Sequence, residues 1–347
     1  MPKRPSLPKA VQRLIPMFSR RALRRVIRIY FRGPANVFAA AVIFAALFCA
    51  LFADLIAADL PIACRLNGEL HILPALTRDG ALAGYDNQRI AAEVAQNGGW
   101  TLAPPIPYGP EQMKCDGDIQ WLEAPSRQHL LGTDDNGRDV LARLIHGFRT
   151  ALLVGLGSML LGASFGIALG ALAAWFGGHL DRIARHMTQT FTIFPALFLI
   201  LAIQGLLGKG SLWQLVFLIA ATCWTDVARA TRAEMLRVAN EPYVEAARAL
   251  GLGHIRILRR YMIPVIKGPI LVSATFSVAS AMVIESTLSF IGYGVAAPTA
   301  SWGGLLRDAL YSEAQGVLMF APGIALTCLV LAVNLVSEGL SEALDRT

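Results

Sequence analysis

Three carboxylates in the stretch GTDDNGRDVLAR could in principle do acid–base or metal chemistry. They are Asp134, Asp135 and Asp139. Catalytic carboxylates work together with a nucleophile, a base or a set of metal ligands, and no such set accompanies these three. Helix capping and ion pairing are therefore the favoured interpretation. Thr133 is expected to cap a helix that begins at Asp134, and Asp139 to pair with Arg143 four residues later.

Nucleotide hydrolysis is the second chemistry that the sequence could hold. The segment GKGS, Gly208–Ser211, lacks the adjacent lysine and serine of a phosphate-binding loop, and Ile203 stands where the first glycine of that loop should be. The patterns HExxH and GxSxG do not occur, and the five cysteines form no CxxC pair or Cys/His cluster. We therefore expect no catalytic residues, no metal and no cofactor bound by this chain, and no ATP hydrolysis by it.

The composition indicates a membrane protein. Of the 347 residues, 55% are hydrophobic and 16% are charged, and the mean hydropathy is +0.51. Soluble domains contain about 25% charged residues. The net charge of +7 suits lipid headgroups and cytoplasmic loops. No nucleic-acid-binding motif accompanies it, so no nucleic acid partner is expected.

Long apolar runs define the expected fold class. A helix needs about 20 residues to cross a hydrocarbon core of ~30 Å. We expect an all-α membrane protein of six transmembrane helices, with an irregular extracytoplasmic insertion after the first. Glycines in the second run, from Gly155 to Gly170, are spaced for close helix contact. The six runs are Val37–Ala57, Thr150–Phe176, Phe191–Leu207, Leu212–Val227, Pro269–Ile291 and Val317–Val336.

Positive charge orients these spans. Residues 1–33 carry ten Lys and Arg and no acid, and they form either a helix on an anionic membrane surface or a solvated basic tail. Placing the N-terminus in the cytoplasm also places 177–190, 228–268 and the C-terminus there, and these segments together hold most of the 31 Lys and Arg. The positive-inside rule thus predicts that both termini are cytoplasmic. The segment boundaries that follow are 1–33, 34–57, 58–149 and 150–347.

Residues 58–149 are predicted to form an extracytoplasmic subdomain. Four prolines in Gly99–Gln112 exclude a regular helix there, whereas 87–96 could form a short one. Cys64 and Cys115 could form a disulfide in an oxidising periplasm or remain two thiols, because their spacing does not set their geometry. The end of the subdomain is predicted to be an amphipathic helix on the membrane surface that leads into the second span.

The polar segment Glu241–Pro264 lies in the cytoplasm on this topology. Pro242 suits the first turn of a helix, and Gly251 allows a left-handed stop. His254 is expected to begin a second short helix, which Pro264 ends as the chain re-enters the membrane. Small residues, a glycine break and a proline at these spacings predict a rigid pair of helices that settles into a groove of a partner.

The same segment resembles a known family. EAARALGLGHIRILRRYMIP is similar to the EAA loop of ABC-importer membrane subunits. HLLGTDDNGRDVLARLIHGFR and ESTLSFIGYGVAAPTASWGGLLRDA resemble signatures of the C-type permease subunit of dipeptide, oligopeptide and nickel importers. IRIYFRGPANVFAAAVIFAALFCALFADLIA matches the opening span of that group more loosely. The resemblance covers about residues 27–57 and 128–347, and three motifs in this order are specific to the group.

This resemblance implies a type I ABC importer architecture in the bacterial inner membrane. The implied partners are a second permease subunit, two ABC ATPase subunits that bind ATP and Mg, and a periplasmic solute-binding protein that delivers a peptide or peptide-like substrate. Closure of the ATPases would move the coupling loop, 228–268. The residues implied to contact the ATPase or to shape this loop are Glu245, Ala246, Ala247, Arg248, Gly251, Leu252 and Pro264.

The resemblance also implies a gate or a binding-protein contact on the outer side. Its glycines could let the chain bend or approach a neighbour closely. The insertion, residues 58–127, is longer than in common members and resembles the extended loop of the subgroup that imports longer peptides such as microcin C. We expect it to help receive the binding protein, because Trp100, Tyr108 and Trp121 lie in a polar setting. The residues of the implied gate are Gly292, Gly294, Pro298, Trp302 and Gly303.

Polar residues inside the apolar runs are further functional candidates, because they are costly in lipid. Two other functions stay open from sequence. A secondary transporter working alone should carry inverted repeats and broken helices, which the sequence does not show. A membrane-anchored receptor leaves Glu241–Pro264 unexplained. The polar candidates are Gln204, Asp226, Glu285 and Asn334.

Overall fold

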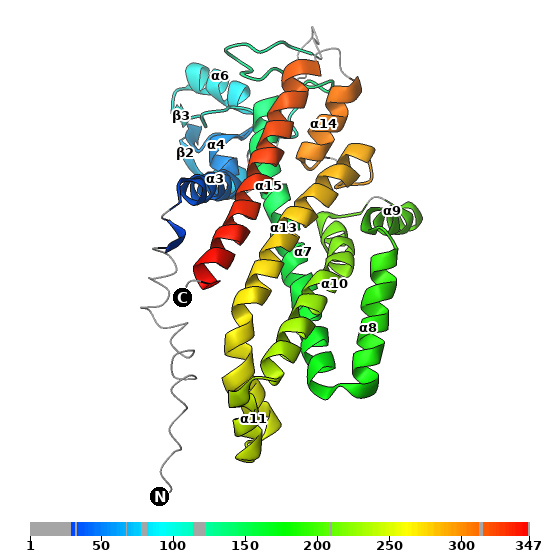
Figure 1. Cartoon of the computed structure of the whole chain (residues 1–347). Helices are drawn as coiled ribbons and strands as arrows, with labels where there is room; N and C mark the ends of the chain where they lie inside the picture. Colours follow the sequence, from blue (N-terminus) through cyan, green and yellow to red (C-terminus); the bar gives the residue numbers. More distant parts are fainter. Residues whose placement is uncertain are drawn as a thin grey trace, which may run out of the picture.

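Long helices build most of the chain, as the computed structural model of the protein shows (Figure 1). The structure describes residues 29–345 apart from 32, 67, 78–81, 83, 114–121, 209, 297 and 312–314. The expected basic segment 1–33 therefore lies almost wholly outside the described residues. The long helices are α3 (Pro34–Leu51), α7 (Val140–Phe176), α8 (Gly178–Ile193), α9 (Ala196–Leu207), α10 (Leu212–Ala239), α13 (Ile263–Ile291), α14 (Trp302–Tyr311) and α15 (Gln315–Asp345).

Four helices in the described part of the chain are long and apolar enough to cross a membrane. They are α3, α7, the helical stretch His254–Ile291 and Leu318–Ala343 within α15. The pair α8 and α9, bent by 81°, makes a fifth if it counts as one span. Length and hydropathy thus give four or five spans in the described part of the chain, against the six expected. The apolar part of α10, Leu212–Val227, rises only about 24 Å, which is less than the ~30 Å of the hydrocarbon core.

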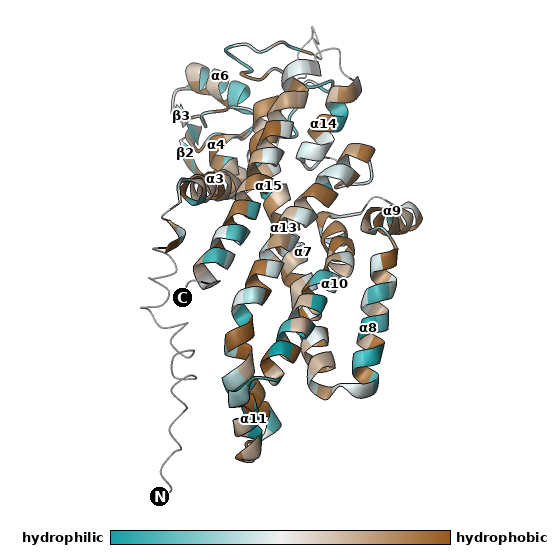
Figure 2. Cartoon of the chain, viewed as in Figure 1, coloured by the Kyte–Doolittle hydropathy of each residue, from teal (hydrophilic) through white to brown (hydrophobic). Residues whose placement is uncertain are grey.

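Hydrophobic and hydrophilic residues are distributed unevenly among the helices of the bundle (Figure 2). Hydrophobic residues dominate α3 and α9, whereas hydrophilic residues gather in α8 and in the lower parts of α10 and α15. The segment 177–190, expected on the cytoplasmic side, forms most of helix α8. Asp181 of α8 accepts a hydrogen bond from Arg232 Nη2 of α10 at 2.9 Å, which ties the two helices together.

Helices α7 and α10 pack backbone against backbone. A Cβ atom at Gly166 would lie 2.6 Å from the Trp224 carbonyl oxygen, and one at Gly170 would lie 2.4 Å from that of Ala228. Both distances are too short for any side chain. The close contact expected from the glycine spacing of this span is confirmed.

The insertion was expected to be irregular, but it contains a small sheet covered by a helix. The strands β1 (Ala63–Leu66), β2 (Glu69–Ile72) and β3 (Trp100–Leu102) form an antiparallel sheet in the order β2-β1-β3. The expected helix at 87–96 is confirmed as α6 (Asn87–Asn97). The short helix α4 (Ala53–Ile56) precedes β1 in the sequence, and the short helix α5 (Pro74–Thr77) follows β2.

The proposed disulfide stays a prediction. Cys64 is buried in β1, within a small core that it shares with Leu66, Leu82 and Ile90. Cys115 lies outside the described residues, as does Trp121.

Helix α7 begins at Val140, six residues later than expected. Asp139 caps it by accepting a hydrogen bond from Ala142 N at 2.7 Å. Thr133 does not cap a helix but accepts a hydrogen bond from Glu123 N at 2.8 Å. The first turns of α7 are continuous with the span, so the expected amphipathic helix is the beginning of α7 itself.

Candidate functional site

The chain turns sharply at the end of the molecule that lies opposite the insertion (Figure 1). Helix α11 (Pro242–Ala249) has its proline in the first turn, as expected. Gly251 adopts φ +70°, which is the left-handed stop, and α12 (His254–Ile257) starts after Gly253. The predicted pair of short helices is confirmed as local structure.

Pro264 has a different place from the expected one. A π-helical turn, Leu258–Met262, leads from α12 straight into α13, and Pro264 lies in the first turn of α13. Proline is well tolerated there because the first-turn N–H groups have no partner within the helix. Pro264 therefore begins the long helix instead of ending a short one. Helical residues therefore run without a break from α12 through the π-helical turn into α13.

The inner side of α11 belongs to the core of this chain. Val244 is fully buried and Ala247 is 3% exposed. Both lie in one apolar cluster with Ile257 and Met262, and the half-buried Leu252 packs against it. Ala247 and Leu252 thus hold the loop in place and do not lie on its open surface.

The outer side of the loop mixes charge with two protruding apolar side chains. Glu245, Ala246 and Arg248 are exposed, as the resemblance implied. Leu250 is 74% exposed and Ile255 is 72% exposed. Sequence reasoning missed these two residues, because periodicity alone does not separate the inward Leu252 from the outward Leu250.

An aromatic ring anchors the outer side to α7. The Arg248 guanidinium lies 5.8 Å from the centre of the Trp175 ring, and the His254 ring meets the same tryptophan edge-on at 5.5 Å. Trp175 stands at the end of α7, so α7, α11 and α12 meet at this residue. Burial raises the pKa of Tyr243, which packs against the same apolar cluster as Val244 and Ala247. The loop is therefore a fixed platform.

A buried ion network occupies the opposite end of the molecule. The Asp134 carboxylate is 0% exposed and accepts hydrogen bonds from Arg138 Nε at 2.9 Å and from Arg143. Asp308 of α14 accepts from Arg143 Nη1 at 2.8 Å and from Arg138 Nη2 at 3.3 Å. The expected Asp139–Arg143 pair does not form, because both arginines turn toward Asp134 and Asp308. The network fastens the start of α7 to α14, and we name it the ion network.

Asp139 meets a different partner. Its carboxylate lies 2.8 Å from His129 Nδ1, and the Tyr108 ring stacks on the His129 ring at 4.4 Å. Tyr108 is therefore packed against His129, which lies beside the start of α7. Within the described residues, no three His, Cys, Asp or Glu side chains are grouped so that they could hold a metal ion.

The implied gate segment is packed inside this chain. Gly292 ends α13 with φ +99°. A Cβ atom at Gly303 would lie 2.1 Å from the Ser286 carbonyl oxygen, and one at Gly294 would lie 2.4 Å from Ser289 Cα. The close approach that these glycines allow is thus to α13 of the same chain.

Trp302 is buried rather than presented to a binding protein. It is 1% exposed, its Nε1 donates a hydrogen bond to the Leu144 carbonyl at 2.9 Å, and its ring packs edge-on against Phe148. Pro298 differs from the other four residues of the gate set because it is exposed.

The four polar candidates within the bundle separate into three structural residues and one groove residue. Gln204 is buried and accepts from Gln214 Nε2 at 3.5 Å, and Glu285 is buried and accepts from Ser289 Oγ at 2.7 Å. Asn334 is half-buried in α15. The Asp226 side chain is 68% exposed and lines a groove of about 440 Å³ between α10 and α13. The groove also contains Ser273, Ser277 and Ser280.

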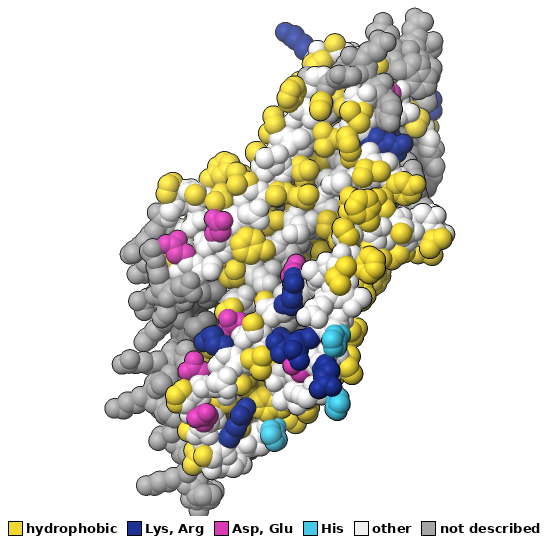
Figure 3. Space-filling model, turned by 45° about the vertical axis from the view of Figure 1, so that its right-hand side comes forward, with side chains coloured by type: hydrophobic (Ala, Val, Ile, Leu, Met, Phe, Trp, Pro, Cys, Tyr) yellow, Lys and Arg dark blue, Asp and Glu magenta, His cyan; other side chains and the backbone are white. Residues whose placement is uncertain are grey.

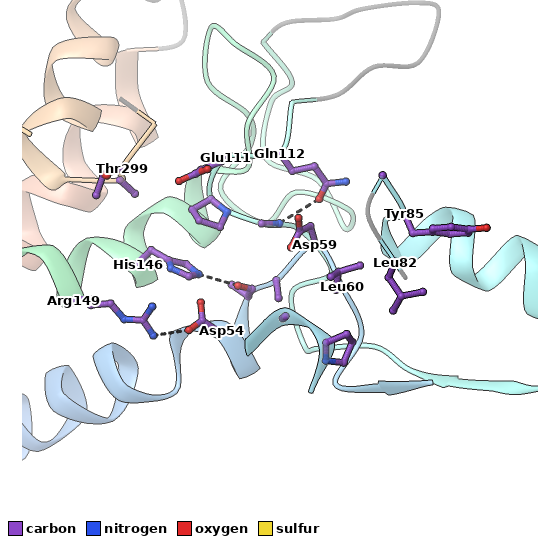
Figure 4. A pocket seen from close by; sticks show the side chains of 18 of the residues that line it. Asp54, Asp59, Leu60, Leu82, Tyr85, Glu111, Gln112, His146, Arg149 and Thr299 are labelled. Carbon is purple, nitrogen blue, oxygen red and sulfur yellow. Dashed lines mark hydrogen bonds and ion pairs between the residues drawn. The ribbon is translucent and has the colours of Figure 1, made fainter. Parts of the chain in front are cut away.

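A larger cavity of about 590 Å³ separates the insertion from α7 (Figure 4). On its floor Arg149 of α7 donates to Asp54 Oδ2 at 2.8 Å, and His146 Nε2 donates to the Ala57 carbonyl at 2.9 Å. Asp59 and Glu111 also line it. These contacts tie the end of the first span to α7 and so set where the insertion begins.

Comparison with known proteins identifies the family. Residues 166–347 match the family described as the binding-protein-dependent transport system inner membrane component. The di/tripeptide transport system permease protein of Pseudomonas aeruginosa is 37% identical over 243 residues, which are 69% of this chain and 80% of that protein.

Solved structures show the fold. Two inward-facing structures of the MetNI methionine ABC transporter match with TM-scores of 0.50 and 0.51. The identities are 17% and 18%, and the matches cover 58% and 59% of this chain and 96% and 97% of the matched chains. The expected all-α membrane fold of the type I importer is thereby confirmed. The platform of α11 and α12, the glycine-packed spans and these relatives agree, and the chain belongs to the family of inner membrane permease components of binding-protein-dependent transport systems.

Proposed function

We propose that the chain is one of two permease subunits of an ATP-driven importer and forms half of a path for peptides or peptide-like solutes. The observation that carries the proposal is the outer side of α11. It presents Glu245, Ala246 and Leu250 on a base that Val244 and Ala247 bury in the core. A rigid, exposed platform of this kind suits a partner that pushes on it.

The partners in this proposal are two ABC ATPase subunits, a second permease subunit and a periplasmic binding protein. ATP and Mg are bound by the ATPase subunits. Movement of the platform tilts α13, because α12 continues into α13 through helical residues only. In this way ATP-driven motion at one end of the molecule alters the path between α10 and α13.

The distribution of charge supports a cytoplasmic location for the platform and both termini. Figure 3 shows Lys, Arg and His side chains gathered on the lower part of one face, with hydrophobic side chains above them. In α8, Arg182 and Arg185 are exposed, whereas Ala184 between them is buried. Positive residues at one end of the spans are typical of the cytoplasmic side.

The substrate class in this proposal is a short peptide. The relative from Pseudomonas aeruginosa is named for di- and tripeptides. The groove with Asp226 offers a carboxylate and three serine hydroxyls between two helices of the bundle. A carboxylate there would attract the ammonium group of a peptide. Uptake of peptides of graded length, in wild type and in Asp226→Asn, measures this contribution, and an unchanged length profile and rate would remove Asp226 from the path.

The central test places the same substitution at two exposed alanines. Ala246→Arg adds a long cation to the outer side of α11, and Ala95→Arg adds one to α6 in the insertion. The complete importer is reconstituted in liposomes, and co-purification of the ATPase subunits, ATP hydrolysis and uptake are recorded. We expect Ala246→Arg to lose ATPase association or coupled uptake, and Ala95→Arg to keep ATPase association.

The proposal fails if Ala246→Arg keeps both the ATPase subunits and full uptake. It also fails if the chain alone takes up peptide into liposomes without ATP, because a secondary transporter would then be the better description.

A further inference from the structure

The sheet of the insertion has two unlike faces. Cys64 and Leu66 of β1 point to one face, where they pack on Ile90 of α6 and on Leu82. Their cross-strand neighbours His71, Thr101 and Glu69 lie on that face too, since opposed residues share a face. Helix α6 thus covers this side of the sheet.

The other face is apolar and uncovered by described residues. The strand register aligns Leu70, Arg65 and Trp100 in one row across the three strands. The next row on the same face is Ile72, Ala63 and Leu102. The exposed fractions are 56% for Leu70, 62% for Ile72, 46% for Trp100 and 54% for Leu102. We name these six residues the bare face.

The bare face carries a positive charge in addition to its apolar side chains. Arg65 is exposed at its centre, and none of the six residues is acidic. A sheet side that meets water usually alternates polar residues with the buried ones of the other side. Here four large apolar side chains take those places. Tryptophan with leucine and isoleucine around one arginine is the composition found where protein meets the headgroup region of a bilayer.

The position of the sheet favours lipid as its neighbour. Only residues 57–62 separate the end of α4 from β1, so the sheet stays close to the end of the first span. Figure 1 shows the strands between α6 and α3, with α6 on the side away from α3. Helix α3 carries its own lipid-type surface, in which Phe44 is 72% exposed, Phe48 49% and Leu51 73%. The bare face and these side chains of α3 are thus two exposed apolar surfaces joined by a short stretch of chain.

We propose that the bare face rests on the lipid bilayer and holds the insertion against the membrane surface. Trp100 and Leu102 enter the headgroup region, and Arg65 reaches a lipid phosphate. Contact of the sheet with lipid then keeps α6 and the rim of the 590 Å³ cavity at a constant distance from the spans. A docked protein is the competing occupant. The short connection to the first span, residues 57–62, favours lipid over it.

The test uses a photoreactive amino acid in the full importer, reconstituted with the binding protein in lipid that carries a labelled acyl chain. The amino acid replaces Leu70 or Leu102 on the bare face, Phe44 on α3 as the positive control, or Ala92 on α6 as the negative control. All four positions are exposed, so the replacements fit without disturbing the core. We expect labelled lipid adducts when the photoreactive amino acid is at position 70, 102 or 44, and no lipid adduct when it is at position 92.

A charge variant tests the same contact independently. Leu102→Glu places a carboxylate against the headgroup region and is expected to reduce the lipid adduct formed at position 70. The matched change Ala92→Glu is expected to leave it unaltered. The proposal is overturned if positions 70 and 102 form adducts with the binding protein or another subunit, if they form none while position 44 forms lipid adducts, or if Leu102→Glu leaves the adduct unchanged.

Discussion

The two ends of the molecule use charge in opposite ways. The segment 129–143 and the segment 241–264 both mix acids, arginines and glycines in the sequence. In the first, Asp134 is 0% and Arg143 4% exposed, and their partners include Asp308 from the far end of the chain. In the second, Glu245 and Arg248 are exposed and the packing below them is apolar.

Buried charges at one end hold two helices of this chain together, whereas exposed charges at the other end remain accessible to a partner. The buried charges of the ion network pair with one another, because an unpaired charge in a dry interior is costly, and these pairs hold the start of α7 to α14. Exposed charges lose little if they change partners, so the platform can meet another protein. The end next to the insertion thus holds its charges in buried pairs, whereas the other end leaves its charges on the surface.

Removing the central carboxylate of the ion network should have the largest effect. Asp134→Asn leaves two buried guanidinium groups with Asp308 as the remaining carboxylate among their described partners, and breaking a buried pair costs about 3–5 kcal/mol. We expect a marked fall in the thermal unfolding temperature of the detergent-solubilised protein. The matched change Asp226→Asn, at an exposed ion pair, should alter it little. Equal effects of the two would show that the ion network does not hold α7 to α14.

An added methyl group at the gate segment should have the next largest effect. Gly303→Ala places a Cβ 2.1 Å from the Ser286 carbonyl, so α14 must move away from α13. Overpacking of this kind costs about 1–3 kcal/mol. The neighbouring Gly304→Ala meets only the Ser301 hydroxyl at 3.1 Å and should cost less. Unfolding of both variants under one detergent condition ranks them, and an equal or reversed order would contradict the packing described for α14.

The smallest expected effect on stability is at the platform. Arg248→Gln removes the guanidinium from the face of Trp175, an interaction of about 0.5–1 kcal/mol. Unfolding should change little, while amide exchange in α11 becomes faster. Arg256→Gln, on exposed α12, serves as the control and should leave exchange in α11 unaltered. If Arg248→Gln destabilised the whole chain as much as Asp134→Asn, the contrast between the two ends would not hold.

Local geometry was predictable from short stretches of sequence. Pro242 in a first turn, Gly251 in a left-handed stop and a helix at 87–96 all depend on neighbours a few residues away. The motifs of the coupling loop and of the gate segment were sufficient for the family. The glycine contact of α7 with α10 was also predictable, because close backbone approach requires glycine at regular spacing.

Distant partners decided the remainder. Arg143 bonds Asp308, 165 residues away, instead of Asp139, which is four residues away, because folding brings α14 over the start of α7. Trp302 is buried under Leu144, and Leu250 rather than Leu252 faces outward, for the same kind of reason. The insertion was expected to be irregular because its strands are three or four residues long and acquire their pattern only when paired.

The chain's composition, apolar runs and motifs were enough to establish a membrane permease, since hydrophobic length and local turn chemistry act within single segments. Which charges are buried, which side of α11 is open and which face of the sheet is bare depend on segments that meet only in the folded molecule. A side chain is buried only when another segment packs over it, so its burial cannot be read from its own stretch of sequence.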